Sequence, residues 1–182
     1  MPASKELFKK YPNPIFIETG SLYGSGVQYA IEAGYEIIYS IELSPKLYNY
    51  CVKRFENYPH VYIIMGDSSD VLKELLPTIN EPITFWLDGH YSGEGTALGS
   101  RSSPVIQELE AIANHKIKSH TILIDDLRIW TIEEYGFDAD VLKEKIREIN
   151  KEYVFSYEDT LSHDGNNFIT FKNDVLVAKI NN

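Results

Sequence analysis

A short apolar run that leads into a glycine-rich turn constrains this chain more than any other feature. Residues 15–18 predict a buried strand, and Gly20, Gly24 and Gly26 follow it within seven positions of one another. Residues 27–33 then predict a helix. In α/β proteins, a buried strand that passes through such a turn into a helix presents backbone N–H groups to a ligand at the carboxyl edge of the sheet. We therefore expect an α/β fold with a ligand site at this turn.

The rest of the chain repeats the alternation of strand and helix. Further strands are predicted at residues 36–42, 61–65, 83–87 and 121–124. Helices are predicted to begin at residues 44–45 and 103–104 and to span residues 71–76 and 139–150, with a turn at residues 66–70. This order favours a doubly wound, mostly parallel sheet with helices on both faces.

The end of the chain has a different pattern. Residues 153–157, 168–171 and 175–180 are three short strand candidates, with turns at residues 164–167 and 173–174 and no helix between them. They predict an antiparallel C-terminal hairpin at one edge of the sheet. No linker or shift in composition divides the 182 residues, so we expect one domain over residues 1–182.

Charge and cysteine content narrow the class of partner. The net charge of −10 argues against nucleic acid and against an anionic membrane surface as partners, because both attract basic proteins. Cys51 is the only cysteine, which excludes an internal disulfide and a cysteine-rich zinc site. With no apolar leader or membrane-length segment, the chain is expected to be soluble and cytoplasmic, to act on a small molecule, and to leave homo-oligomerisation open.

Every predicted parallel strand ends in an acidic residue. These residues are Glu18, Glu42, Asp67, Asp88, Asp125 and Asp126. Glu42 lies 22 residues after Gly20, the offset at which a carboxylate reaches ribose hydroxyls in nucleotide-binding βαβ units. Asp67 and Ser68 are expected to form hydrogen bonds with the edge of an adenine base. Glu18 is expected either to orient the glycine turn or to pair with an ammonium group of the ligand. The alternative is that these acids are solvated strand ends in an acidic chain.

Two common phosphate-binding motifs do not fit. A dinucleotide fingerprint needs a third glycine where Tyr29 stands, and no P-loop motif occurs.

The remaining pattern resembles the class I S-adenosylmethionine-dependent methyltransferases. The resemblance is carried by Glu18-Thr19-Gly20, Gly24, Glu42 and Gly66-Asp67-Ser68. It is strongest to the E-x-G-x-x-x-G-x-S pattern of the catechol and macrocin O-methyltransferases, from which Gly26 departs by standing in place of serine. Ser25, next to it, is a candidate for the same contact. The resemblance implies these donor-binding residues: Glu18, Gly20, Ser21, Gly24, Ser25, Glu42, Asp67, Ser68 and Asp88.

The same resemblance implies a metal ion. Asp88, Asp125 and Asp126 are expected to meet at one strand edge and to hold Mg²⁺, a cation that prefers oxygen ligands and lowers the pKa of a bound hydroxyl. Consecutive strand residues point to opposite faces, so Asp125 and Asp126 reach one ion only if the strand has already turned. An N-terminal helix cap or simple solvation remains the alternative for Asp126.

His90 is the best candidate for a general base, because imidazole titrates near neutrality and lies two residues beyond Asp88. The alternative is that it caps or packs its loop. Residues 89–103 are expected to form a lid, with Arg128 and Trp130 lining an acceptor pocket.

The leading hypothesis is S-adenosylmethionine-dependent methyl transfer to a hydroxyl of a small molecule, assisted by Mg²⁺, with His90 as base. A non-catalytic ligand-binding protein on the same fold is the second hypothesis, and an NAD-linked oxidoreductase is the third.

Overall fold

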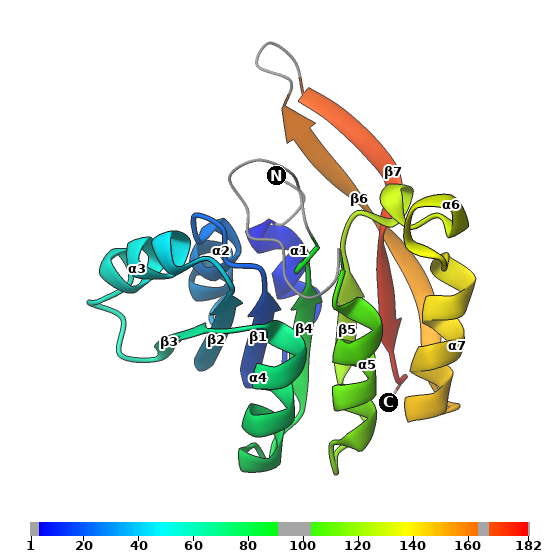
Figure 1. Cartoon of the computed structure of the whole chain (residues 1–182), viewed down its shortest axis with the longest axis horizontal. Coiled ribbons are helices and arrows are strands. Elements are labelled where there is room, and N and C mark those ends of the chain that lie inside the picture. The colour runs from blue at the N-terminus through cyan, green and yellow to red at the C-terminus, as the bar shows by residue number, and fades with distance from the viewer. Residues whose placement is uncertain (1–3, 91–102, 164–167, 182) are drawn as a thin grey trace.

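The computed structural model describes residues 4–90, 103–163 and 168–181. Its strands form one sheet in the order β3-β2-β1-β4-β5-β7-β6 (Figure 1). They are β1 (Ile15–Thr19), β2 (Ile37–Glu42), β3 (Val61–Met65), β4 (Ile83–Leu87), β5 (Thr121–Ile124), β6 (Val154–His163) and β7 (Phe168–Lys179). Strands β1 to β5 are parallel, and β7 is antiparallel to both β5 and β6. The predicted mostly parallel sheet with an antiparallel C-terminal hairpin is confirmed.

The helices fall between the strands as the sequence pattern requires. They are α1 (Lys5–Lys9), α2 (Ser25–Ala33), α3 (Pro45–Arg54), α4 (Ser68–Leu75), α5 (Val105–Asn114), α6 (Ile132–Tyr135) and α7 (Ala139–Ile149), with short 3₁₀ helices η1 (Leu76–Thr78) and η2 (Leu127–Ile129). Within the described residues, none of these helices is long and apolar enough to cross a membrane.

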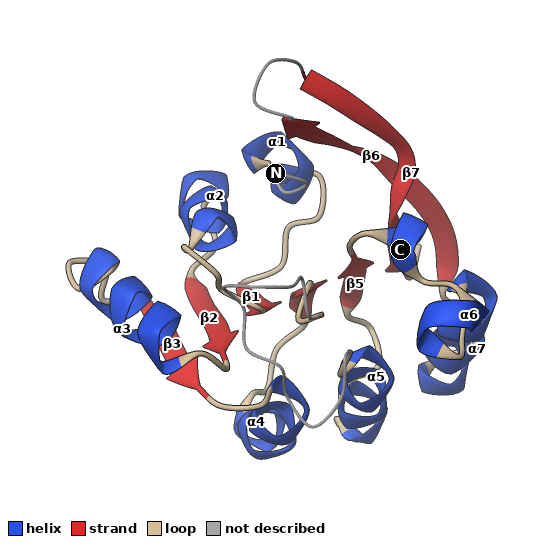
Figure 2. Ribbon diagram, turned by 45° about the horizontal axis from the view of Figure 1, so that its top comes forward, coloured by secondary structure: helices blue, strands red, loops and turns tan. Residues whose placement is uncertain are grey.

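The sheet separates two apolar cores. Helices α1, α2 and α3 cover one face, and α4, α5 and α7 cover the other (Figure 2). In β1, Phe16 packs in the first core, whereas Ile15 and Ile17 pack in the second. All five residues of β1 are buried, which accounts for the uninterrupted apolar run from Ile15 to Ile17 and leaves Glu18 and Thr19 as buried polar groups at its end.

Helix α4 begins three residues earlier than predicted. The predicted turn over residues 66–70 is wrong for its second half, because Ser68 and Ser69 are already helical. Asp67 is the N-cap, and its carboxylate accepts hydrogen bonds from the backbone N–H of Ser69, at 3.0 Å, and from the Ser69 hydroxyl, at 2.8 Å. Such a cap satisfies N–H groups that would otherwise lack partners in the first turn.

The C-terminal hairpin has two long strands where the sequence predicted three short ones. Asn173 and Asp174, predicted as a turn, lie inside β7. Asn173 does adopt the left-handed conformation of a turn residue, with φ +55°, but its N–H is held by Asp159 of β6 at 3.0 Å. The strand register shifts between Glu158 and Thr160, so the chain forms a bulge and continues. The predicted turn at residues 164–167 lies outside the described residues.

Candidate functional site

The glycine turn after β1 lies at the point where the strand order reverses. From β1 the chain proceeds to β2 and β3 on one side, and later to β4 and β5 on the other. Gly20 has φ +84°, and a Cβ atom there would stand 2.6 Å from the backbone oxygen of Asp88. The turn after β1 therefore packs directly on the exit of β4, at the switch point where open α/β sheets bind ligands.

A buried carboxyl group fills the inside of this turn. Glu18 accepts a hydrogen bond from the Ser40 hydroxyl at 2.5 Å, and Ser40 is also bonded to Ser21 at 2.6 Å. Burial raises the pKa of Glu18 to about 8. A Cβ atom on Gly26 would lie 1.8 Å from Glu18 Oε1. The serine of the methyltransferase pattern thus has no room at position 26 in this chain.

The other predicted donor-binding acids have internal partners. Glu42 accepts hydrogen bonds from the backbone N–H of Leu22, at 2.9 Å, and of Ser44, at 2.8 Å. Its carboxylate thereby ties the glycine turn to the start of α3. Asp67 caps α4, as described above.

One buried acid beside these residues was not predicted from the sequence. Glu108 of α5 is 1% exposed, and its Oε1 accepts a hydrogen bond from Ser68 at 2.5 Å. Its Oε2 has no hydrogen-bond partner in the described part of the chain, and burial raises the pKa of the carboxyl group to about 7. The available signal was an acid on the apolar stripe of α5, between Val105 and Ile112.

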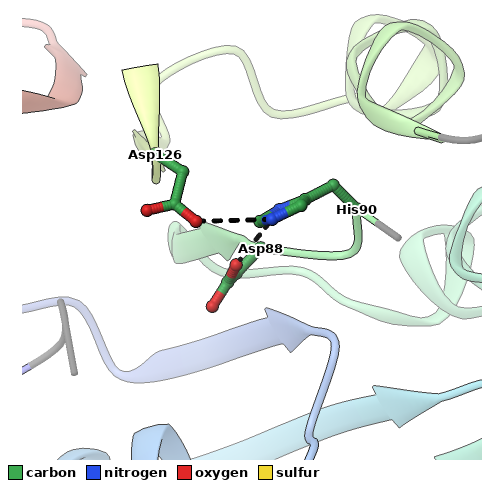
Figure 3. A group of neighbouring side chains, drawn as sticks. All are labelled: Asp88, His90 and Asp126. Atoms are coloured by element: carbon green, nitrogen blue, oxygen red, sulfur yellow. Dashed lines mark ion pairs between the residues drawn. The ribbon is translucent and has the colours of Figure 1, made fainter. Parts of the chain in front are cut away.

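A second set of side chains meets beyond β4 and β5 (Figure 3). The ring of His90 lies between two carboxylates: its Nδ1 is 3.4 Å from Asp88 and its Nε2 is 3.3 Å from Asp126. One ligand atom from each of the three residues lies within 4.8 Å of the others. Burial lowers the pKa of His90, which favours the neutral imidazole. The structure therefore brings together three of the four residues predicted for this half of the site.

Asp125 belongs to a different group. One of its carboxylate oxygens lies within 4.8 Å of a carboxylate oxygen of Asp126 and of Asp174. Neither carboxylate oxygen of Asp125 has a hydrogen-bond partner among the described residues. Burial, followed by the negative charge of Asp88, raises its pKa well above the usual range. The chain turns at Asp126, which has φ +56°, so the two consecutive aspartates face different neighbours.

Two further residues predicted near an acceptor pocket are anchored internally. Arg128 is ion-paired with Asp126 and Asp174. Trp130 is buried, and its indole N–H donates to the backbone oxygen of Asp125 at 2.9 Å. The ring of His90 stands edge-on to Trp130, with centroids 5.7 Å apart. Most of the predicted lid, residues 91–102, lies outside the described residues.

Comparison with known proteins supports the fold without fixing the chemistry. No protein-family model matches the chain, and no curated protein does. Among solved structures, an O-methyltransferase from Bacillus cereus in complex with SAH is similar with a TM-score of 0.66 and 14% identity, over 97% of this chain and 78% of that one. The O-methyltransferase TomG from Streptomyces achromogenes, in complex with SAM, gives a TM-score of 0.61 and 11% identity, over 98% and 78%.

The N-methyltransferase NodS from Bradyrhizobium japonicum, in complex with SAH, is similar with a TM-score of 0.54 and 9% identity, over 91% of this chain and 76% of that one. The chain thus has the fold of class I S-adenosylmethionine-dependent methyltransferases. Because the matches include O- and N-methyltransferases, the fold does not define the atom that is methylated.

Proposed function

We propose that this protein transfers a methyl group from S-adenosylmethionine to a hydroxyl group of a small molecule. The observation that carries the proposal is the packing of Gly20 on the backbone of Asp88. This contact places the glycine turn next to the group of Asp88, His90 and Asp126. A donor site and a group suited to acid–base or metal chemistry therefore share one edge of the sheet.

The donor site would be formed around the glycine turn. Gly20 and Gly24 give access to its backbone, and Ser21 and Ser25 line it. Glu18 and Glu42 hold the turn from beneath through Ser40 and the N–H of Leu22. The N-terminus of α4, with Asp67 and Ser68, would receive the adenosine end.

The acceptor would be activated by His90. Methyl transfer forms a bond from the acceptor oxygen to the methyl carbon and breaks the bond from that carbon to sulfur, so the hydroxyl proton must leave. A neutral imidazole accepts this proton, and the carboxylates of Asp88 and Asp126, beside its two nitrogens, would stabilise the resulting imidazolium.

The residues present also fit a divalent cation. Asp88 and Asp126 offer the carboxylate oxygens that Mg²⁺ prefers. Neutral His90 lies beside them and would keep its one free lone pair for the acceptor proton rather than ligate the ion. Asp125 belongs to the neighbouring acidic group, and a bound cation would favour its charged form, which burial disfavours. A bound cation would supply Lewis-acid polarisation of the acceptor hydroxyl.

Donor binding is tested without knowledge of the acceptor. We expect S-adenosylhomocysteine at 100 times its Kd to stabilise the fold by about 2.7 kcal/mol, seen as a rise in Tm. Gly20→Ala should abolish the rise, because its Cβ would collide with the backbone at Asp88. Gly34→Ala is the matched control: Gly34 also has positive φ, but nothing lies within 4 Å of its Cβ position. A wild-type Tm that does not respond to millimolar ligand would contradict the proposal.

Catalysis is tested by transfer of a labelled methyl group to a panel of small hydroxyl compounds. His90→Gln should lower kcat by about 10²- to 10⁴-fold, the usual contribution of a general base. His60→Gln, at a histidine that packs by Tyr58 just before the N-terminal end of β3 and so away from the carboxyl edge, should leave kcat unchanged. Loss of turnover on chelation would support the metal. Donor binding with no turnover on any acceptor would favour a non-catalytic binding protein.

A further inference from the structure

Two groups of metal-ligating side chains share one residue. Asp126 belongs both to the group with Asp88 and His90 and to the group with Asp125 and Asp174. The first group contains two acids and an imidazole. The second contains three carboxyl groups, with one oxygen of each within 4.8 Å of the others, an arrangement in which like charges repel unless a cation or a proton intervenes.

The second group already has a cation, which is the side chain of Arg128. Its Nη1 lies 2.6 Å from Asp126 Oδ1 and hydrogen-bonds to Asp174 Oδ2. The backbone N–H of Arg128 donates to the other oxygen of Asp174 at 3.3 Å. The guanidinium also lies over the ring of Phe171, 4.3 Å from its centroid. Arg128 is therefore held on several sides.

The C-terminal hairpin places the acid that anchors this arginine. Asp174 is buried and also accepts a hydrogen bond from the Thr160 hydroxyl at 2.6 Å. It directly follows Asn173, the residue with φ +55° at the bulge. Bulges re-aim side chains next to functional sites. Here the bulge comes immediately before the carboxylate that holds Arg128 beside Asp126.

The contacts of Asp126 differ between its two oxygens. Oδ1 faces Arg128, whereas Oδ2 faces His90 Nε2 at 3.3 Å. An arginine fixed on one oxygen leaves the other for His90 or for an ion in the first group. A backbone at φ +56° is unfavourable for an aspartate, so this orientation needs outside support.

We propose that Arg128, anchored by Asp174, is a positioning residue that serves as the built-in cation of the second acidic group. It excludes divalent ions from that group and fixes Asp126 with one oxygen toward His90. The kinetic part of this inference rests on the proposed function, but the part on ion exclusion does not.

Ion exclusion is measured on the whole chain with Mn²⁺ alone, with no donor or acceptor. Wild type should bind at most one ion, by paramagnetic resonance or calorimetry. Arg128→Gln should bind one additional ion, or bind Mn²⁺ at least ten times more tightly, because Asp125, Asp126 and Asp174 then lack their cation. Adding Asp174→Asn should remove that gain. Unchanged stoichiometry and affinity in Arg128→Gln, or two ions in wild type, would overturn the proposal.

Two variants keep the result interpretable. Arg128→Lys retains the charge and should exclude the additional ion as wild type does, even if Arg128→Gln folds poorly. Arg147→Gln is the matched control, because Arg147 also lies over an aromatic ring of the hairpin, 4.9 Å from the centroid of Phe155. It should leave Mn²⁺ binding unchanged, and a gain in this control would count against a specific role for Arg128.

If methyl transfer is detected, Arg128→Gln should lower kcat at least tenfold, with less than a threefold change in the KM for the donor. Arg128→Lys should restore most of kcat. Equal loss of kcat and of donor affinity would indicate a general structural defect and overturn the positioning role. If no methyl transfer is found, the proposed function fails while the Mn²⁺ measurement still decides ion exclusion.

Discussion

The backbone of Gly26 lies so close to the carboxyl group of Glu18 that a side chain does not fit between them. Two effects oppose each other when alanine is placed there. Alanine in a helix is favoured over glycine by about 1 kcal/mol. Overpacking a rigid interior costs about 1–3 kcal/mol. Glu18 is buried and bonded to Ser40, so it has little freedom to move and the clash should dominate.

We predict that Gly26→Ala lowers the free energy of unfolding by up to about 2 kcal/mol, as the difference of these two terms. Chemical denaturation measures it directly. In a Glu18→Ala background the same change should be neutral or stabilising, because the carboxyl group that blocks the Cβ is gone. An equal loss in both backgrounds would show that Glu18 is not the cause.

Single residues also mark the limit of what the sequence predicts in the site. The meeting of Asp88, His90 and Asp126 follows from a local rule, because the carboxyl ends of neighbouring parallel strands share one edge. The contact of Arg128 with Asp174 joins residues 46 positions apart through a bulge. No periodicity or spacing signals such a contact. Asp125 and Asp126 of the second acidic group were therefore predicted as site residues, whereas Asp174 was not.

At the scale of elements, a pair of buried histidines joins α5 to the start of β4. His115 caps the C-terminus of α5, and its ring stacks on His120, with Nδ1 2.8 Å from His120 Nε2. The backbone N–H of Ile83 donates to His120 Nδ1 at 3.1 Å. This fixes the proton on His120 Nε2, which then donates to His115, whose Nε2 faces the backbone oxygen of Ile79 at 3.1 Å. The chain of bonds requires neutral His120.

The elements show why most of the fold, including an antiparallel C-terminal hairpin, was predictable and the length of the two hairpin strands was not. Strands β1, β4 and β5 are buried almost throughout, and each of the five parallel strands contains an apolar run bounded by turn residues, although the edge strand β3 is partly exposed. In β7, a left-handed asparagine followed by an aspartate is the composition of a turn and of a bulge alike. Only the bond from Asn173 to Asp159 on the neighbouring strand separates the two outcomes.

At the scale of the whole molecule, buried ionisable groups should make stability depend on pH with opposite signs. Burial lowers the pKa of His120 to about 4, below its ordinary 6.5, so unfolded chains bind more protons between these values. Stability from His120 is therefore present above pH 6.5 and lost as pH falls. Burial raises the pKa of Glu18 to about 8, above its ordinary 4.5, so its contribution is present at low pH and lost as pH rises toward 8.

The contributions of His120 and Glu18 to the free energy of unfolding can be told apart between pH 6.5 and 8. Below this window they oppose each other, each with a slope of about 1.4 kcal/mol per pH unit. As pH rises through the window, His120 and His90, whose pKa is also lowered by burial, lose their protons in the unfolded state too, and the carboxyl groups come to dominate the trend. Glu42 adds to the raised pKa of Glu18 through its negative charge. Glu108, Asp88 and Asp125, whose pKa values are also raised, act in the same direction. A comparison with a non-titrating variant is needed to isolate Glu18.

We predict that the free energy of unfolding of wild type, from urea titrations, falls as pH rises from 6.5 to 8. Glu18→Gln should flatten this fall by up to about 1.4 kcal/mol per pH unit, the limit for one proton. His120→Asn retains an acceptor near the N–H of Ile83 and should leave most of the fall intact, because His120 titrates mainly below this window. If Glu18→Gln keeps the wild-type slope, the carboxyl group beneath the glycine turn is already ionised at neutral pH. The glycine turn would then pack on a negatively charged carboxylate, which would pair with the ammonium group of the donor.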